Sequence, residues 1–342
     1  MPIIQRLLTT FLLIFALSWA SYGQNDTIVS TRGEILIGKI EILEKGILTF
    51  ETHYSDKDFN IEWDQIQEMK TSRTFLIILT DGRRMNGSVN SLPGDSSIVM
   101  ITSGFRFFMI DDILDIVYLK PVESTFFGRL DASIEVGYTF TKENNNHQFN
   151  TRSSIGYFAD TWGVNGFFDM NQSVQDSVAP TQRTDASVGF IKYFENSWYL
   201  GLSNNFFQSN EQKIKLRSIT NVSYGHFIIN TYKSYWGLGA GLAYNYESFT
   251  SDEPDEKSLE ALINSELNLF AFEDLSLLST LKLYPSITVR GRIRSDFKFD
   301  IKYDLPLDFF IKLGLTHNYD NQPVVGAAEH DFIFQTTFGW EL

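Results

Sequence analysis

Residues 130–141 read LDASIEVGYTFT, and apolar and polar side chains alternate from one end of this stretch to the other. Successive side chains of a β-strand point to opposite faces of a sheet, so this spacing gives the strand one apolar and one polar face. The apolar face carries Leu130, Ala132, Ile134, Val136, Tyr138 and Phe140. Alternating segments of about ten residues, separated by turns, are typical of a membrane-spanning β-barrel.

The same alternation returns in three later segments, at residues 236–246, 292–303 and 332–342. A soluble β-sandwich also alternates, so the ends of the strands decide between the two classes. Trp236, Tyr246 and Trp340 stand near the ends of apolar faces, and amphipathic rings favour the level of the lipid headgroups. This placement favours a barrel in contact with outer-membrane lipid.

The last strand ends in Phe-Gly-Trp-Glu-Leu, residues 338–342. This ending resembles the C-terminal signal by which the barrel assembly machinery recognises outer-membrane barrels, although such strands usually end in Phe or Trp and this one ends in Leu342. The resemblance implies that the assembly machinery is a partner of the chain through its C-terminal strand.

The pattern predicts about twelve strands, an even number as in bacterial single-chain barrels, which puts both barrel ends on the periplasmic side. Long polar connections are expected at 171–184, 247–258 and 318–330, alternating with short ones, as outer loops alternate with inner turns. The predicted strands lie near residues 127–142, 147–160, 162–175, 182–195, 197–209, 212–228, 234–249, 257–273, 275–288, 291–304, 308–319 and 330–342.

The composition excludes several classes of function. The net charge of −14 opposes nucleic acid as a partner, because phosphate binding needs a basic surface. The chain has no cysteine, which excludes disulfides, zinc–thiolate sites, thiol catalysis and an N-terminal lipid on cysteine. We therefore expect no cofactor and no metal site.

Residues 1–23 predict a cleaved signal peptide. Arg6 supplies the positive charge, an apolar run follows from Leu7 to Ala16, and Ser21 and Gly23 suit cleavage before Gln24. The apolar run is too short for the roughly 20 residues of a spanning helix. Export and the barrel together predict an outer-membrane location, with the segment before the barrel in the periplasm.

Residues 24–120 contain an internal repeat. Gly33 aligns with Gly82 and Gly38 with Gly87 at one common offset, and each unit closes on a similar pattern, IEWDQIQEM (61–69) and FMIDDILDI (108–116). Glycines suit tight turns and bends between short strands. The G-x4-G pattern resembles Sm-like or SH3-like small barrels, and we expect a β-rich spacer or a module that docks a periplasmic partner.

Residues 121–342 would form the outer-membrane barrel, and its polar face would line the lumen. Two interpretations of the charged lumen stay open: a hydrophilic pore with a basic wall, or a plug of ion pairs that fills the interior. An eight-stranded barrel is filled by side chains and a sixteen-stranded one leaves a channel, so twelve strands decide neither. The candidate lumen residues are Asp131, Glu135, Lys213, Lys215, Arg217, Glu266, Arg292, Arg294, Asp296, Lys298, Asp300 and Lys302.

Evidence for catalysis is weak. The five histidines lack the spacing of metal ligands, and the acidic loop at 251–257 lacks the order of a calcium loop. Twelve-stranded outer-membrane phospholipases carry a Ser-His-Asn set on the outer face, and His226 is the single histidine expected on that face. No Ser and Asn partners match that motif, so a lipid hydrolase is the alternative to a non-enzymatic barrel of structural, envelope or passive-diffusion role.

The mature chain resembles the family called domain of unknown function 481, in the form found in Bacteroidetes, whose members are described as salt-induced outer-membrane proteins. The resemblance rests on three stretches, Asn25–Ile66, Phe75–Val89 and Phe126–Asn145. It implies an exported barrel. It implies no activity and no functional residues, because the activity of the family is undefined.

Overall fold

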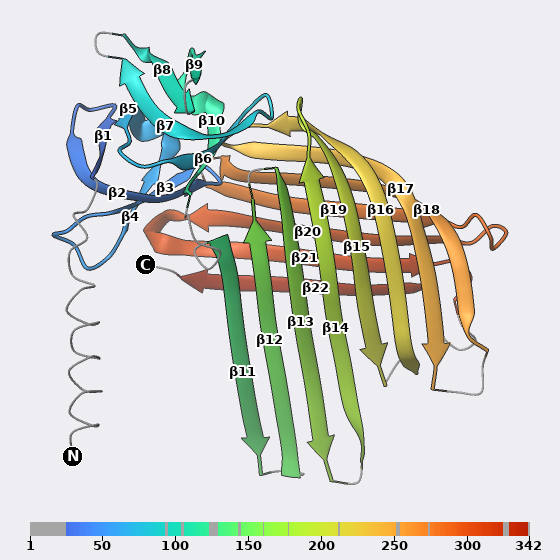
Figure 1. The fold of residues 1–342 in the computed structure, drawn as a ribbon. Helices are drawn as coiled ribbons and strands as arrows, with labels where there is room; N and C mark the ends of the chain where they lie inside the picture. Colours follow the sequence, from blue (N-terminus) through green and yellow to red (C-terminus); the bar gives the residue numbers. More distant parts are fainter. Residues whose placement is uncertain are drawn as a thin grey trace, which may run out of the picture.

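The computed structural model describes two β-sheets that follow one another along the chain (Figure 1). The predicted signal peptide and the last two residues of the predicted assembly signal lie outside the described residues. Within the described part, no helix is long and apolar enough to cross a bilayer. The described residues are 25–92, 95–103, 106–122, 129–142, 145–159, 161–176, 178–210, 213–250, 254–272, 274–323 and 328–340.

The first sheet is built from two copies of one unit, which confirms the predicted two-repeat β-domain. Each unit has four strands, a single 3-10 turn and a fifth strand. The first unit comprises β1 (Asp26–Ser30), β2 (Ile35–Glu44), β3 (Ile47–Glu51), β4 (Phe59–Glu62), η1 (Trp63–Gln65) and β5 (Ile66–Lys70). The second comprises β6 (Phe75–Leu79), β7 (Arg84–Leu92), β8 (Asp95–Ser103), β9 (Arg106–Ile110), η2 (Ile113–Asp115) and β10 (Ile116–Pro121).

Six of these strands close into a ring in the order β1, β5, β7, β6, β10, β2 and back to β1. In each unit the fifth strand pairs with the first strand of its own unit and with the second strand of the other unit. Neither repeat therefore forms a barrel alone, and the two share one closed barrel, called the small domain below. Its common core holds Ile28, Phe50, Trp63, Phe75 and Ile101, all completely buried.

The paired glycines have the roles that the repeat predicts. Gly33 and Gly82 have φ angles of +83° and +82° and form the turns after β1 and β6, in the region where a residue without Cβ is favoured. Gly38 and Gly87 have ordinary φ angles, but a Cβ there would overlap the carbonyl of Glu51 or Thr102 on the neighbouring strand. These two positions let adjacent strands approach closely where the small domain bends.

The second sheet contains twelve antiparallel strands in sequence order, which confirms the all-β, twelve-stranded prediction. Its strands are β11 (Leu130–Thr141), β12 (Asn146–Phe158), β13 (Trp162–Gln175), β14 (Val178–Tyr193), β15 (Trp198–Ser209), β16 (Ile214–Asn230), β17 (Ser234–Phe249), β18 (Glu256–Phe272), β19 (Leu275–Pro285), β20 (Ile293–Leu305), β21 (Phe309–Asp320) and β22 (His330–Trp340).

The large sheet curls strongly along its width (Figure 1). Within the described residues, β11 and β22 each pair on one side, so they form the two edges of the curled sheet. As the first and the twelfth strands of an up-and-down order they run in opposite directions, which is the arrangement that an antiparallel closure needs.

One predicted loop is instead a hairpin. The sequence predicts a long connection at 171–184, but β13 continues to Gln175 and β14 already begins at Val178, with Ser173 opposite Thr181. Polar side chains occupy both faces of this hairpin, so the alternation that identifies the other strands is hidden here. The connections after β17 and β21 fall where the sequence predicts them.

Candidate functional site on the inner face of the large sheet

Residues that lie opposite each other in neighbouring strands share a face, so the register divides the large sheet into two sides. The side that carries Glu247, Glu260 and Arg294 is called the inner face, and the opposite side the outer face. One row of the inner face runs through Asp131, Gly156, Asn165, Gly189, Ser203, Asn221, Ala243 and Glu260. The inner face is the candidate site because its polar side chains converge as the sheet curls.

The inner face of β16 to β21 holds a network of buried ion pairs. Arg294 donates two hydrogen bonds to Glu260, from Nη2 to Oε2 at 2.6 Å and from Nε to Oε1 at 3.1 Å. The Glu260 side chain is completely buried. Arg217 Nε lies 3.1 Å from Oε1 of the buried Glu247. Two parallel N–H···O bonds make an arginine–carboxylate pair both strong and specific in geometry.

A third arginine extends the network to the strand ends. Arg292 lies directly before β20, and its Nη2 is 2.7 Å from Asp320 Oδ2 while its Nη1 is 3.3 Å from Glu256 Oε2. Ala243, Leu262 and Tyr284 pack beside these pairs as a small buried cluster. Near these strand ends the inner face is therefore packed with paired charges and apolar side chains.

The inner face of β11 to β14 differs in composition and exposure. It carries amides such as Asn150, Asn165 and Asn171, and its ion pairs stay near the surface. The Arg152 side chain, paired to Asp169 at 2.8 Å, is 60% exposed. The inner face thus has a charged half that is packed at one end and an exposed, amide-rich half.

The small domain contacts the short turns at one end of the large sheet. Lys233 Nζ lies 3.6 Å from Asp64 Oδ2, and Asn230 donates to the Leu79 carbonyl at 3.3 Å. Tyr232 packs against the core of the small domain. These contacts come from the turn after β16, so the small domain sits at the end of the sheet opposite to the ion-pair network.

From this position the small domain reaches the inner face. The Arg84 guanidinium carbon lies 3.9 Å from the centre of the Tyr193 ring, and Tyr193 occupies an inner-face position of β14. Burial raises the pKa of Tyr118, on β10, to about 12, so its hydroxyl stays protonated near neutral pH. Inner-face Tyr235 donates to Glu266 close by, which makes this end of the lumen rich in tyrosine.

Most of the predicted lumen residues lie on the inner face. Asp131 and Glu135 are exposed on β11, Glu266 accepts the Tyr235 hydroxyl, and the pairs of Arg217, Arg292 and Arg294 are described above. On β20, Asp296 lies opposite Lys282, Lys298 pairs with Asp300 at 3.2 Å, and Lys302 pairs with Asp304 at 3.0 Å.

Lys213 and Lys215 do not share this face. Lys213 lies in the turn before β16 with a φ angle of +55°. A register shift between Ile214 and Leu216 makes Lys215 the extra, exposed residue of a β-bulge. Simple alternation from Arg217 backwards misses this shift, because a bulge inserts one residue without any change in the residue pattern.

The acidic partners of the arginines were not predicted from the sequence. Glu247 and Glu256 fall within the predicted connection at 247–258 and Asp320 within the one at 318–330, whereas Glu260 lies on the same face of its strand as the predicted Glu266. Extending the alternation of β18 towards its start would have found Glu260. Neither strand alone indicates that Glu260 meets an arginine of β20.

Two of the five histidines come together on the outer face. His317 Nε2 and His330 Nδ1 are 3.1 Å apart, which fits one shared hydrogen bond. Among the residues that the structure describes, no group of three or more metal-ligating side chains is placed to hold an ion.

Comparison with known protein families finds a match for the part of the chain that forms the large sheet. Residues 134–341 match the family model described as "Protein of unknown function, DUF481". The chain belongs to the DUF481 family. The DUF481 match begins within β11 and runs past β22, so the twelve-stranded sheet carries it. The small domain precedes the match, and the Bacteroidetes form of the family stays a prediction. No curated protein matches the chain significantly.

Proposed function

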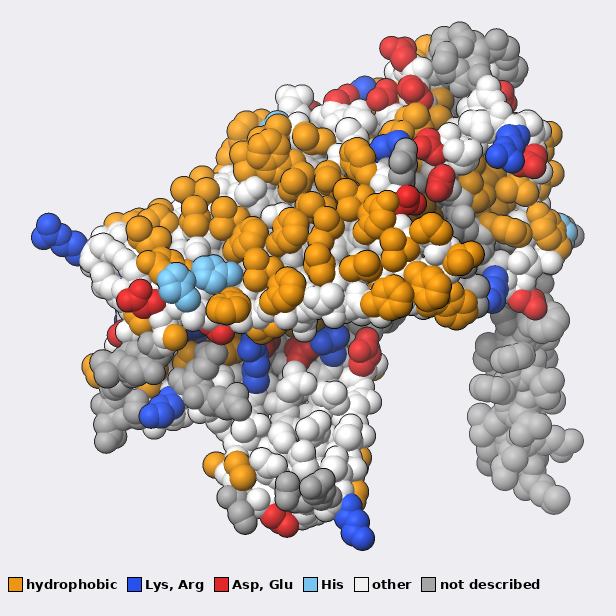
Figure 2. Space-filling view, turned by 180° about the vertical axis from the view of Figure 1, so that it is seen from behind, with side chains coloured by type: hydrophobic (Ala, Val, Ile, Leu, Met, Phe, Trp, Pro, Cys, Tyr) orange, Lys and Arg blue, Asp and Glu red, His pale blue; other side chains and the backbone are white. Residues whose placement is uncertain are grey.

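We propose that this DUF481 protein is a non-enzymatic outer-membrane β-barrel that provides a passive-diffusion path, with its small domain in the periplasm as a cover for the inner mouth. The apolar outer face carries this proposal. Soluble monomers rarely expose a contiguous apolar patch above a few hundred Å², whereas Figure 2 shows apolar side chains spread over the large sheet. The exposed residues include Ile134, Val136, Tyr138, Phe140, Ile155, Val164, Val188, Leu202, Val222, Tyr224, Leu242, Ile263, Phe332, Phe334 and Phe338.

The division of the inner face supports a path rather than a solid plug. The charged half between β16 and β21 is packed with ion pairs at the end away from the small domain, while the amide half between β11 and β14 stays exposed. At the inner mouth, Arg84 of the small domain covers Tyr193. A solute would pass along the amide half once the small domain moves aside.

We expect the refolded full-length protein to show no steady conductance steps in a planar lipid bilayer, and the form without residues 25–120 to show them. Arg84→Ala should give intermittent steps, because it removes the contact with Tyr193. Arg83→Ala is the matched control, since Arg83 pairs with Asp81 at 2.6 Å on the exposed turn after β6.

Steps of equal size in the full-length and truncated forms would contradict the cover and leave a simple diffusion pore. Silence in both forms would contradict the path and leave the ion pairs as a plug.

The edges of the sheet give a second prediction, which tests the membrane barrel itself. An open edge leaves a row of unpaired backbone groups, which hydrocarbon does not tolerate, so we expect β22 to pair with β11 in a bilayer. Because the chain has no cysteine, Val136→Cys can be combined in turn with cysteine at Phe332, Phe334, Thr336 or Phe338. At least one pair should oxidise to a crosslink in membranes.

The control combines Val136→Cys with Leu242→Cys, on the distant strand β17, and should not crosslink. If no β11–β22 pair crosslinks in membranes while the protein is correctly inserted, the barrel is not closed by its own edges.

The proposal assigns no catalytic step. His226, the histidine considered for a lipid hydrolase, lies on the outer face with its ring 4.7 Å from the Trp198 ring. The two rings are tilted against each other, and contact with tryptophan at the end of a strand suits a side chain at the headgroup level.

A further inference from the structure

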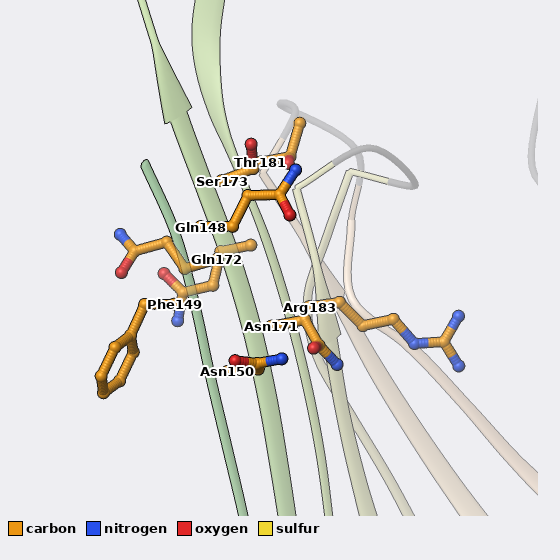
Figure 3. Close-up of a pocket in the computed structure, with 9 residues that line it drawn as sticks. Gln148, Phe149, Asn150, Asn171, Gln172, Ser173, Thr181 and Arg183 are labelled. Carbon is orange, nitrogen blue, oxygen red and sulfur yellow. The ribbon is translucent and has the colours of Figure 1, made fainter. Parts of the chain in front are cut away.

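The amide half of the inner face contains a hollow of about 240 Å³ near the hairpin between β13 and β14 (Figure 3). Its nine lining residues come from three neighbouring strands as three triplets, 148–150, 171–173 and 181–183. It lies at the end of the sheet opposite to the small domain. A solute that enters from outside the cell would therefore meet this hollow first.

The register divides the side chains of the nine lining residues between the two faces of the sheet. The middle residue of each triplet, Phe149, Gln172 or Gln182, has its side chain on the outer face, and both flanking residues have theirs on the inner face. In Figure 3 the Phe149 ring and the Arg183 guanidinium point to opposite sides. Because six of the nine side chains thus lie on the inner face, the hollow is taken on that face, and these six side chains are called its rim.

The rim consists of two rows of directly opposed residues. Gln148, Ser173 and Thr181 form one row, and Asn150, Asn171 and Arg183 form the other. An amide offers both donors and an acceptor, and a hydroxyl does the same. A rim of amides and hydroxyls therefore matches a ligand whose groups also both donate and accept, as sugar hydroxyls do.

The charge of the rim is nearly neutral. Arg183 is the one charged residue among the nine, and its Nε is already 2.9 Å from Asp185 Oδ2. Its guanidinium also lies over the Phe207 ring at 5.0 Å. A free phosphate or carboxylate would have to compete with Asp185 for this arginine, so the rim disfavours anionic ligands.

We propose that this hollow binds a neutral, polyhydroxylated solute, one sugar unit of an oligosaccharide at a time, an inference that rests on the proposed diffusion path and names its substrate class. The volume is below the roughly 300–1,000 Å³ of pockets for drug-sized ligands, which fits a single unit of a longer chain. The hydroxyl groups of the solute would form the hydrogen bonds with the rim of the hollow.

The test uses the full-length protein in lipid nanodiscs and two probes, maltohexaose and a galacturonic acid hexamer, with affinity measured by titration calorimetry. Maltohexaose should bind, and the acidic hexamer should bind at least tenfold more weakly. The double variant Asn150→Leu with Asn171→Leu keeps the side-chain size and should weaken maltohexaose binding at least tenfold. Asn204→Leu, on the outer face of β15 and outside the hollow, should leave the affinity unchanged.

Absence of maltohexaose binding, tighter binding of the acidic hexamer, or equal loss in Asn204→Leu would overturn the proposal. Conductance of the form without residues 25–120 separates this failure from that of the proposed function. If the truncated form shows conductance steps, but the double variant does not change maltohexaose binding, only the proposed sugar site is contradicted. If the truncated form shows no conductance steps, but maltohexaose still binds and the double variant weakens that binding, only the proposed diffusion path is contradicted.

Discussion

Replacing Glu260 with alanine is expected to lower the free energy of unfolding by about 3–5 kcal/mol, the usual cost of removing one partner of a buried ion pair. Glu260 is completely buried and accepts two bonds from Arg294, whose own side chain is only 10% exposed. Without the carboxylate, the guanidinium would stay buried without a counter-charge. The measurement is guanidinium-induced unfolding of the refolded protein in detergent micelles, followed by tryptophan fluorescence.

Two controls separate the buried pair from a general loss of charge. Asp300→Ala breaks a pair whose partner Lys298 is 53% exposed, so its effect should stay below about 1 kcal/mol. The double variant Glu260→Leu with Arg294→Met removes both charges and should recover most of the stability lost in Glu260→Ala. If Glu260→Ala lowers the free energy of unfolding no more than Asp300→Ala does, the buried pair stabilises the barrel no more than an exposed pair.

The positions of the strands were predictable because they depend on local pattern. In β11 the side chains alternate strictly, and in β20 and β22 they alternate with few exceptions, such as Ser295 and Thr336, so the sequence alone gives both the strands and their faces. The small domain was predictable for another reason: two glycines recur at one offset, and each pair meets the same backbone requirement in both units.

Pairing across strands was not predictable in the same way. Arg294 and Glu260 meet because β18, β19 and β20 curl, and alternation within one strand gives the face of a residue but not its neighbour. The bulge at Lys215 and the hairpin of β13 and β14 show the same limit. In both places the hydrogen-bond register, not the residue pattern, decides where a side chain lies.

The closed ring of the small domain is also a property of pairing between distant segments. The repeat predicts two similar units, and two independent small barrels would satisfy the pattern equally well. The structure has one barrel instead, because β5 pairs with β7 and β10 with β2. This exchange makes the stability of each repeat depend on the other.

Trp63 lies in the core that the two repeats share. It belongs to η1, its side chain is completely buried, and its backbone N–H donates to the Gly46 carbonyl at 2.8 Å. The second repeat has the smaller Ile113 at the corresponding position of η2. The single large ring therefore fills space that both repeats enclose.

We expect Trp63→Ala to destabilise the small domain by about 3–5 kcal/mol, the range for deleting a buried large aromatic side chain. The measurement is pulse proteolysis of the full-length protein across a urea series, with cleavage sites identified in each repeat. Asp58→Ala, at an exposed position before β4, is the control and should leave cleavage unchanged. Because the ring of strands is shared, residues 75–121 should become cleavable at the same urea concentration as residues 26–70. Cleavage confined to the first repeat, with the second still protected, would mean that each repeat holds its own core and that the shared barrel is not a cooperative unit.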